Sequence, residues 1–207
     1  MINAVVDLYH GDPVSSFEAV KAAGIAGVIH KATQGLTFQD PTYHDRRAQA
    51  LAAGLLWGAY HFGEGGDGAQ QAQAFLSYVQ PQAGDLLVLD FETNTQGASM
   101  SLAEAEQFVT AVHSATGRWP GLYSSPSYLS QALGHGTSPA LASCWLWIAD
   151  YASAPVVPAN WPYWTLWQYT DGTHGPEPHT VEGVGSCDRD QFNGSLEQLQ
   201  KLWGAAT

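Results

Sequence analysis

The sequence feature that most constrains the fold is an alternation of short apolar segments with longer helical patterns through the first two thirds of the chain. Each apolar segment has the length of a buried strand, and these segments are residues 4–8, 25–31, 55–62, 85–92 and 120–124. The helical patterns follow them in turn and occupy residues 13–23, 41–53, 68–79, 101–117 and 126–133. Because alternating strands and helices form parallel sheets, this region predicts five successive βα units.

Local signals at the ends of these segments support the assignment. Gly24 and Gly54 each follow a helical pattern directly, at the position where a left-handed residue often ends a helix. Ser101, with Glu104 three residues later, has the pattern of a capping box, in which two side chains satisfy free backbone N–H groups at a helix start. These signals place helix boundaries independently of the apolar pattern.

After residue 133 the helical pattern stops. Irregular loops with proline and glycine join three strand-like segments, and a closing helix is predicted at the end; these are residues 144–151, 164–169, 187–192 and 195–203. Five βα units followed by three strands fill eight strand positions, which predicts an α/β fold closed into an irregular TIM-like barrel, (β/α)5(β)3. No linker or low-complexity stretch divides the chain, so we expect one domain over residues 1–207.

Charge and composition restrict the partners of such a barrel. The net charge is -12 with only seven Lys and Arg residues, which leaves no basic footprint for nucleic acid or anionic lipid. No stretch approaches the ~20 apolar residues of a membrane span, so we expect no membrane insertion. The first residues lack the basic and long apolar regions of a signal peptide, so we expect synthesis in the cytoplasm.

Cysteine and histidine give no sign of a metal or cofactor site. Cys144 and Cys187 make neither a disulfide framework nor a metal cluster; buried free thiols are the expected state, with a single bridge left open. His10, His30 and His61 lie at predicted strand ends, but no H-E-x-x-H motif occurs, and structural roles are expected for them rather than metal ligation.

A pair of carboxylates ends the fourth predicted strand. Asp90 and Glu92 are two residues apart, so on a strand they point to the same face, with Cα atoms roughly 6.5 Å apart. Two close carboxyls raise each other's cost of ionising, so one can stay protonated near neutral pH. An acid beside an anion is what glycosidic bond cleavage requires. Taken alone, the pattern also fits acids that cap a helix or pair with a base.

Polar side chains follow the other predicted strands as well. In TIM-like barrels chemistry takes place at the carboxyl ends of the strands. The residues found there are Asp7, Tyr9, His10, His30, Lys31, Tyr60, His61, Tyr123, Ser124, Asp150, Tyr151, Gln168 and Tyr169. Packing does not explain so many polar groups in one place, so we expect a substrate site there. The substrate-binding candidates are Tyr9, His10, Lys31, His61, Tyr123, Asp150, Tyr151 and Gln168.

The order and spacing of several short motifs resemble the glycoside hydrolase family 25 lysozymes, the Chalaropsis-type N-acetylmuramidases. The motifs span almost the whole chain and are VVDLYHG, HKATQG, LLWGAYHF, LLVLDFET, GLYSS, WLWIADY, WTLWQYT and CDRDQFNGS. The resemblance implies a barrel of five βα units and three further strands. It also implies hydrolysis of the β-1,4 bond between N-acetylmuramic acid and N-acetylglucosamine in bacterial peptidoglycan.

The resemblance also assigns roles to individual residues. It implies that Asp90 and Glu92 are the catalytic pair, with Glu92 as general acid, and that Asp7, Asp188 and Tyr60 support the active site. It implies a retaining reaction, in which Asp90 is either a nucleophile or the group that stabilises an oxazolinium ion formed by the substrate's 2-acetamido group. The second route is favoured, because a same-strand pair places Asp90 beside the acid rather than across the sugar.

The chain departs from the family pattern at Tyr9, His10 and Gln34, which bears on substrate specificity and pH dependence. Gln34 stands where the family's K-A-T-E-G motif has a glutamate. Two rival readings are a non-catalytic sugar-binding module on a degenerate barrel and a chitinase-like hydrolase. We expect a monomer that meets the cell wall as a phage or prophage endolysin or as a secreted effector.

Overall fold

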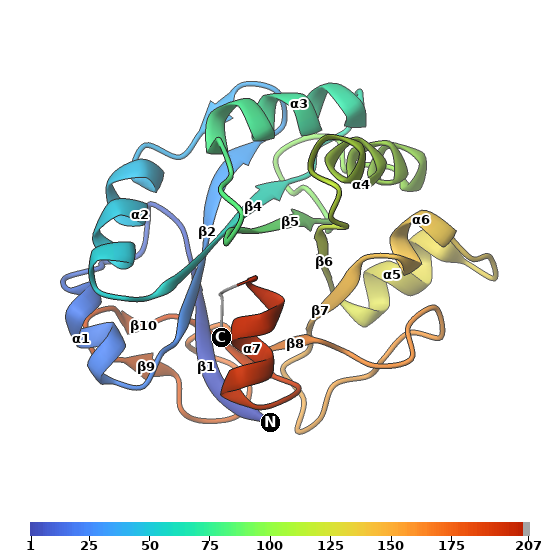
Figure 1. Ribbon diagram of the computed structural model, residues 1–207. Helices are drawn as coiled ribbons and strands as arrows, with labels where there is room; N and C mark the ends of the chain where they lie inside the picture. The colour runs from blue at the N-terminus through green and yellow to red at the C-terminus, as the bar shows by residue number, and fades with distance from the viewer. Residues whose placement is uncertain (205–207) are drawn as a thin grey trace.

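The chain, described over residues 1–204 in a computed structural model, closes into an eight-stranded barrel (Figure 1). The strands follow the order β1–β11–β8–β7–β6–β5–β4–β2, and direct pairing of β1 with β2 closes the ring. The barrel strands are β1 (Ile2–Leu8), β2 (Gly27–Gln34), β4 (Leu56–Phe62), β5 (Leu86–Asp90), β6 (Gly121–Ser124), β7 (Trp145–Ala149), β8 (Leu166–Thr170) and β11 (Asp188–Phe192). The predicted irregular TIM-like barrel is confirmed.

Helices surround the barrel where the first strands cross over to their neighbours, as Figure 1 shows. They are α1 (Phe17–Ala22), α2 (Tyr43–Ala52), α3 (Gly68–Val79), α4 (Leu102–Thr116), α5 (Pro126–Leu133), α6 (Pro139–Ala142) and α7 (Leu196–Leu202). Three short strands lie outside the barrel and were not predicted: β3 (Phe38–Gln39), β9 (Thr180–Val181) and β10 (Gly185–Ser186). No helix among residues 1–204 is long and apolar enough to cross a membrane.

The last strand runs against its neighbours. β11 pairs antiparallel with both β1 and β8, whereas the other barrel pairings are parallel. The parallel arrangement expected for the five βα units therefore does not extend to this strand. A parallel strand needs a crossover connection, usually a helix, and the chain between β8 and β11 contains none. As a result the start of β11, not its end, meets the end of β1, and Asp188 pairs in register with Asp7.

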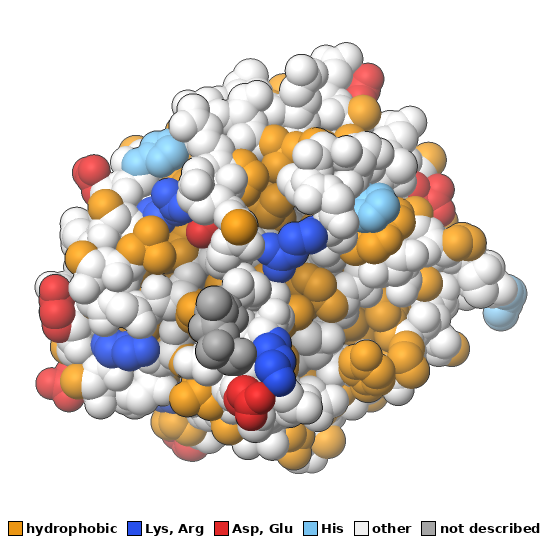
Figure 2. All heavy atoms as spheres, in the orientation of Figure 1, with side chains coloured by type: hydrophobic (Ala, Val, Ile, Leu, Met, Phe, Trp, Pro, Cys, Tyr) orange, Lys and Arg blue, Asp and Glu red, His pale blue; other side chains and the backbone are white. Residues whose placement is uncertain are grey.

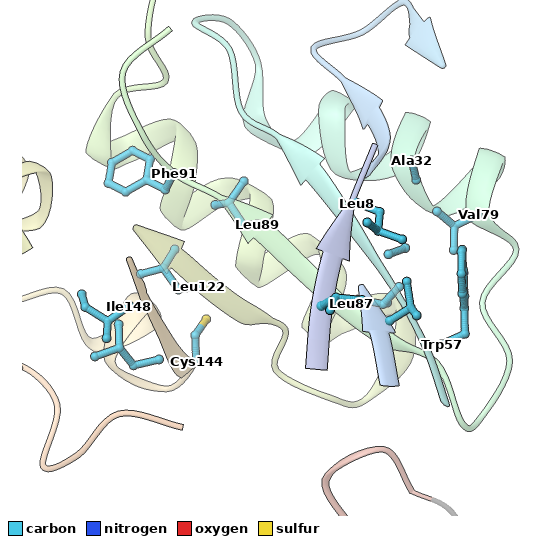
Figure 3. Packing of buried hydrophobic residues seen from close by; sticks show 14 of the residues in the cluster. Leu8, Ala32, Trp57, Val79, Leu87, Leu89, Phe91, Leu122, Cys144 and Ile148 are labelled. Atoms are coloured by element: carbon cyan, nitrogen blue, oxygen red, sulfur yellow. The ribbon is translucent and has the colours of Figure 1, made fainter. Parts of the chain in front are cut away.

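Alternation along the strands divides the core into an inner and an outer layer. On β5, Leu86 and Val88 pack inside the barrel, whereas Leu87 and Leu89 face the helices. Figure 3 shows this outer packing, with Phe91 continuing the outward series. The inward series continues from Val88 to Asp90 by the same period of two. The strand thus delivers its carboxylate to the barrel axis.

Helix α7 seals one end of the barrel, where it lies within the ring of strands in Figure 1. Leu199 and Trp203 are fully buried among the inner residues of the barrel, and Trp203 Nε1 donates to the Trp57 carbonyl at 2.9 Å. Gly27 at the start of β2 leaves room for the Trp203 ring. The interior of the barrel is therefore closed at the amino ends of its strands, and a substrate can approach it from their carboxyl ends.

Capping residues determine where the helices begin and end. The first helix was expected from residue 13 but begins at Phe17, because the Ser16 hydroxyl accepts the Ala19 N–H and caps it there. Gly24 and Gly54 have φ of 93° and 76°, as predicted for residues that follow a helix end. The predicted capping box at Ser101 is confirmed. Both cysteines are buried and free, also as predicted.

Charged side chains are sparse on the face that carries α7. Figure 2 shows them scattered among apolar and uncharged groups on that face, without a patch of one sign. Over the whole sequence, 19 Asp and Glu residues stand against seven Lys and Arg residues, which gives the net charge of -12.

Candidate active site

Seven barrel strands contribute to a small open cavity of about 110 Å³ at the carboxyl end of the barrel. Its lining consists of Asp7, Tyr60, Asp90, Glu92, Tyr123, Trp147, Gln168 and Asp188. Every residue predicted as catalytic or supporting is in this group. A larger hollow of about 270 Å³ lies at the opposite end, but its one carboxylate, Asp85, is already paired with Arg47 at 2.7 Å. The smaller cavity is the one that can carry acid–base chemistry.

Backbone contacts fix the two carboxylates at the end of β5. Phe91 is fully buried and faces outward, so its neighbours Asp90 and Glu92 face the cavity. The Phe91 N–H donates to the Tyr123 carbonyl at 2.9 Å, and the Ser124 hydroxyl donates to the Phe91 carbonyl at 2.6 Å. The strand ends at Asp90, two residues before Glu92, yet these bonds hold the following turn in place.

Burial and charge raise the affinity of this pair for a proton. The pKa of Asp90 lies well above its ordinary value, because of burial and then the charge of Glu92. Burial also raises the pKa of Glu92. The Lys31 ammonium acts in the opposite direction on both groups. Such a pair titrates in two steps, and between these steps it carries one proton, which provides one acid and one anion.

Two aspartates, Asp7 and Asp188, form the floor of the cavity, and the buried Asp190 lies behind them. Asp7 lies within hydrogen-bonding reach of Asp188 and Asp190, so a proton on its carboxyl lowers the pKa of both. Burial works against this effect and is larger, and it raises the pKa of Asp188 to about 7. Asp190 is fully buried and accepts the Trp147 indole N–H at 2.6 Å. The floor therefore retains protons at pH values where free aspartates have lost them.

The amide of Gln168 ties the floor to the rim. Its Nε2 donates to Asp7 Oδ2 at 2.9 Å, while its Oε1 accepts the hydroxyls of Tyr123 at 2.9 Å and Tyr151 at 2.8 Å. Donors on one side and an acceptor on the other fix the orientation of the amide. The two tyrosines and Asp7 are thereby held as one unit.

One predicted substrate contact is misplaced. His61 is fully buried on the side of β4 that faces the helices. Its Nδ1 forms a hydrogen bond with Thr33 Oγ1 at 2.8 Å, and its ring stacks on Phe108 with the ring centroids 4.8 Å apart. Successive strand residues face opposite sides, so Tyr60 can line the cavity only if His61 turns away. Burial lowers the pKa of His61 to about 4, as expected for a structural histidine.

The remaining predicted contacts lie around the rim. Asp150 caps the following loop by accepting the Val156 N–H at 3.0 Å and does not line the cavity. Lys31 is partly buried, with its ammonium 4.9 Å from the Phe62 ring. Tyr9 and His10 are exposed beyond β1. These residues surround the cavity without forming its walls.

Trp147 lines the cavity and Asp190 supports it from behind, but both were absent from the predicted set. Asp190 is two residues after Asp188 on β11, so the alternation that identified Asp90 and Glu92 places it on the same face. Trp147 lies on β7, two residues after Trp145, and its indole N–H donates to Asp190 at 2.6 Å. Within residues 1–204, no group of three or more His, Cys, Asp or Glu side chains is arranged to hold a metal ion.

Comparison with known proteins identifies the family. The profile of Glycosyl hydrolases family 25 matches residues 6–177. An N,O-diacetylmuramidase from Chalaropsis sp is 30% identical over 95% of this chain and 96% of its own length. Solved structures of a Streptomyces coelicolor lysozyme and an Acremonium alcalophilum muramidase each align over 100% of both chains, with TM-scores of 0.86 and 0.85 and identities of 30% and 32%. The chain therefore belongs to glycosyl hydrolase family 25 and is a glycoside hydrolase of its lysozyme class.

Proposed function

We propose that this lysozyme cleaves the β-1,4 bond between N-acetylmuramic acid and N-acetylglucosamine, with Glu92 as general acid. The observation that supports this most is the Asp90–Glu92 pair, which faces one cavity and in which burial raises both pKa values. The relatives aligned over nearly the whole chain are named for muramidase or lysozyme activity. Their names supply the substrate class that the cavity alone does not identify.

Asp90 acts in this proposal as the partner of the substrate's acetamido group. Its Oδ1 is buried and has no hydrogen-bond partner among the described side chains and backbone groups. A buried acceptor without a donor is costly, and a substrate amide N–H can satisfy it. Asp90 would then orient the 2-acetamido oxygen for attack on the anomeric carbon and stabilise the resulting oxazolinium ion. Glu92 gives its proton to the leaving oxygen in the same step.

The floor and the tyrosines have supporting roles. Asp7 and Asp188 line the same cavity as the pair, so they can stabilise positive charge that develops on the sugar ring. Burial keeps the pKa of Tyr60 well above its usual range, so its hydroxyl stays a neutral donor. Tyr123, Tyr151 and Gln168 hold the opposite side of the cavity through their shared hydrogen bonds.

An aromatic rim extends the site along the polymer. Tyr9 and Phe38 are 44% and 37% exposed, and the His10 ring lies between them at 5.1 and 5.8 Å. Asp40 holds the His10 ring through Nδ1 at 2.9 Å. Sugar rings present apolar faces that stack on such side chains, so this rim would bind glycan next to the cleaved bond. Lys31, 5.5 Å from the Phe38 ring, connects the rim to the catalytic pair.

Digestion of purified peptidoglycan tests the proposed linkage. The products are reduced with borohydride and identified by mass spectrometry, which shows the sugar that carries each new reducing end. Reduced muramic acid ends are expected. Reduced glucosamine ends would mean cleavage of the other linkage. No products from folded protein would favour a non-catalytic binding module.

Intact-protein mass spectrometry during turnover tests the role of Asp90. The acetamido route predicts no covalent glycosyl adduct, together with competitive inhibition by a thiazoline that mimics the oxazolinium ion. A glycosyl adduct on Asp90 would instead establish this residue as the nucleophile.

A further inference from the structure

A chain of hydrogen bonds connects the rim cation to a carboxylate outside the catalytic cavity. Lys31 Nζ donates to Gln34 Oε1 at 2.6 Å. Gln34 Nε2 donates to Glu64 Oε1 at 2.8 Å, and Asn94 Nδ2 donates to the same oxygen at 3.2 Å. Neither the catalytic mechanism nor the packing of the barrel requires this chain of contacts.

Glu64, the far end of this chain, is rigidly placed. Gly35 has φ of 53°, and a Cβ there would overlap the Glu64 carboxylate, which therefore lies directly against the Gly35 backbone. The Gln71 side chain accepts the Glu64 N–H at 3.1 Å and donates to the Glu64 carbonyl at 2.8 Å. Glu64 is thus a fixed anchor for the Gln34 amide.

Only an amide satisfies both neighbours of position 34. The Lys31 ammonium needs an acceptor, and the Glu64 carboxylate needs a donor. A carboxylate at position 34 would face Glu64 at hydrogen-bonding distance, where two like charges repel. An apolar side chain would leave Lys31 without this acceptor and Glu64 with Asn94 as its remaining side-chain donor. The amide therefore gives Lys31 a neutral partner in place of a carboxylate.

The unneutralised charge of Lys31 acts on the catalytic pair. Phe62, whose ring lies 4.9 Å from the ammonium, pairs in register with Asp90. The carboxylates whose charge reaches Lys31 are Asp90, Asp40, Glu92 and Glu64. None of the four forms an ion pair with Lys31 within 4.0 Å among the described residues.

We propose that Gln34 is a positioning residue, which holds the Lys31 ammonium beside the Asp90–Glu92 pair as an unpaired cation and thereby sets the upper pH limit of activity. This inference rests on the proposed role of Glu92 as acid. A cation near the pair favours its fully ionised form, so the pair loses its catalytic proton at lower pH. A direct ion pair between Lys31 and a carboxylate would weaken this effect and move the limit upward.

The test is an exchange of the two side chains, Gln34→Glu with Glu64→Gln. The exchange keeps net charge and nearly the same volume, but it places a carboxylate directly on Lys31. It also puts an amide NH2 where Glu64 Oε1 accepted Asn94, so that one weak hydrogen bond is lost. We expect a folded variant with a slightly lower melting temperature and a basic limb of the kcat/KM–pH profile that moves up by roughly half a pH unit. Gln34→Met, which removes both hydrogen bonds without adding charge, should also move the limb upward, because Lys31 is released toward solvent.

A basic limb that stays in place in both folded variants would overturn the proposal, as would a downward shift. NMR titration of the Asp90 and Glu92 carboxyls in the wild type and the exchange variant gives the same comparison without substrate. It separates the two claims: unchanged carboxyl titration refutes the role of Gln34, whereas an active Glu92→Gln variant refutes only the assignment of the acid.

Discussion

At the scale of single residues, Gln168 connects the acidic floor to the tyrosines of the rim. The hydrogen bond from its amide lowers the pKa of Asp7, against the larger effect of burial. The same amide is the acceptor for the hydroxyls of Tyr123 and Tyr151. No other described side chain serves all three groups, so the geometry of the site depends on this residue.

Replacement of Gln168 by leucine should reduce both stability and activity. The change leaves buried Asp7 Oδ2 without its donor, at a cost of about 1–3 kcal/mol. Differential scanning calorimetry should show a melting temperature lower by roughly 3–10 °C, and kcat on peptidoglycan should fall as the floor loses its fixed geometry. Gln70→Leu on exposed α3 is the matched control. Equal effects of the two changes would remove Gln168 from the site.

Tyr9 should contribute to binding of the polymer rather than to bond cleavage. Its ring is exposed on the rim, and aromatic stacking contributes roughly 0.5–1.5 kcal/mol beyond area burial. Tyr9→Ala should therefore raise KM by about three- to tenfold with kcat nearly unchanged. Tyr163→Ala, at an exposed tyrosine outside the site, should leave both constants unchanged. A fall in kcat alone for Tyr9→Ala would contradict a role of Tyr9 in polymer binding.

The sequence predicted which side chains share a face where this depended only on the alternation of residues along one strand. Asp90 and Glu92 were found in this way, and Asp190 could have been found by the same rule. His61 was misassigned because the sequence shows that neighbours face opposite sides but not which side is inward. The contact between Gln34 and Glu64 joins different strand ends and could not be predicted from spacing.

At the scale of elements, the helix starts are fixed by side-chain caps. At α4 the Ser101 hydroxyl accepts the Glu104 N–H, and Glu104 Oε2 accepts the Ser101 N–H at 2.7 Å. Glu104 Oε1 also accepts the Gly66 N–H at 2.9 Å, which ties α4 to the segment before α3. The cap therefore holds two helices on the outside of the barrel.

Ser101→Ala should destabilise the protein without changing its chemistry. Loss of an N-cap costs about 1 kcal/mol, which corresponds to roughly 2–4 °C in melting temperature for a chain of this size. Because α4 contributes no side chain to the cavity, kcat/KM should stay at the wild-type value. Thr110→Ala, at an exposed position within the same helix, should have a negligible effect. Equal melting temperatures for Ser101→Ala and wild type would contradict the role of the cap.

The order and type of the main elements could be predicted, whereas details of direction could not. Apolar runs and glycine punctuation located the barrel strands and the helices between them. The direction of β11 escaped prediction, because it depends on how the chain returns through an irregular loop. The short strand β3, which brings Phe38 to the rim, lacks an apolar run of its own.

At the scale of the whole molecule, the buried acids make stability depend on pH. Asp7, Asp90, Asp188 and Asp190 all have raised pKa values in the folded state, chiefly through burial. Between the unfolded value near 4 and the folded values, the folded state binds more protons than the unfolded state. The free energy of unfolding therefore falls as pH rises through this window. Repulsion within a chain of net charge -12 acts in the same direction.

The melting temperature should accordingly be higher at pH 5 than at pH 7.5, by roughly 5 °C or more. Asp188, with a pKa of about 7, titrates inside this range. Asp188→Asn should therefore flatten the dependence. Thermal unfolding monitored by circular dichroism in buffers of equal ionic strength measures both effects. A melting temperature that rises from pH 5 to pH 7.5 would contradict the claim that the buried aspartates have raised pKa values in the folded state.

The central claim is that the barrel cleaves peptidoglycan through the proton held by Asp90 and Glu92. The most direct measurement compares release of reducing ends from peptidoglycan by the wild type, Glu92→Gln, and the exposed control Glu182→Gln. Glu92→Gln should retain the wild-type melting temperature and lose activity by ~10³-fold or more, since a general acid contributes about 10²–10⁴-fold. Glu182→Gln should match the wild type. A folded Glu92→Gln variant with near-normal release of reducing ends would contradict the account.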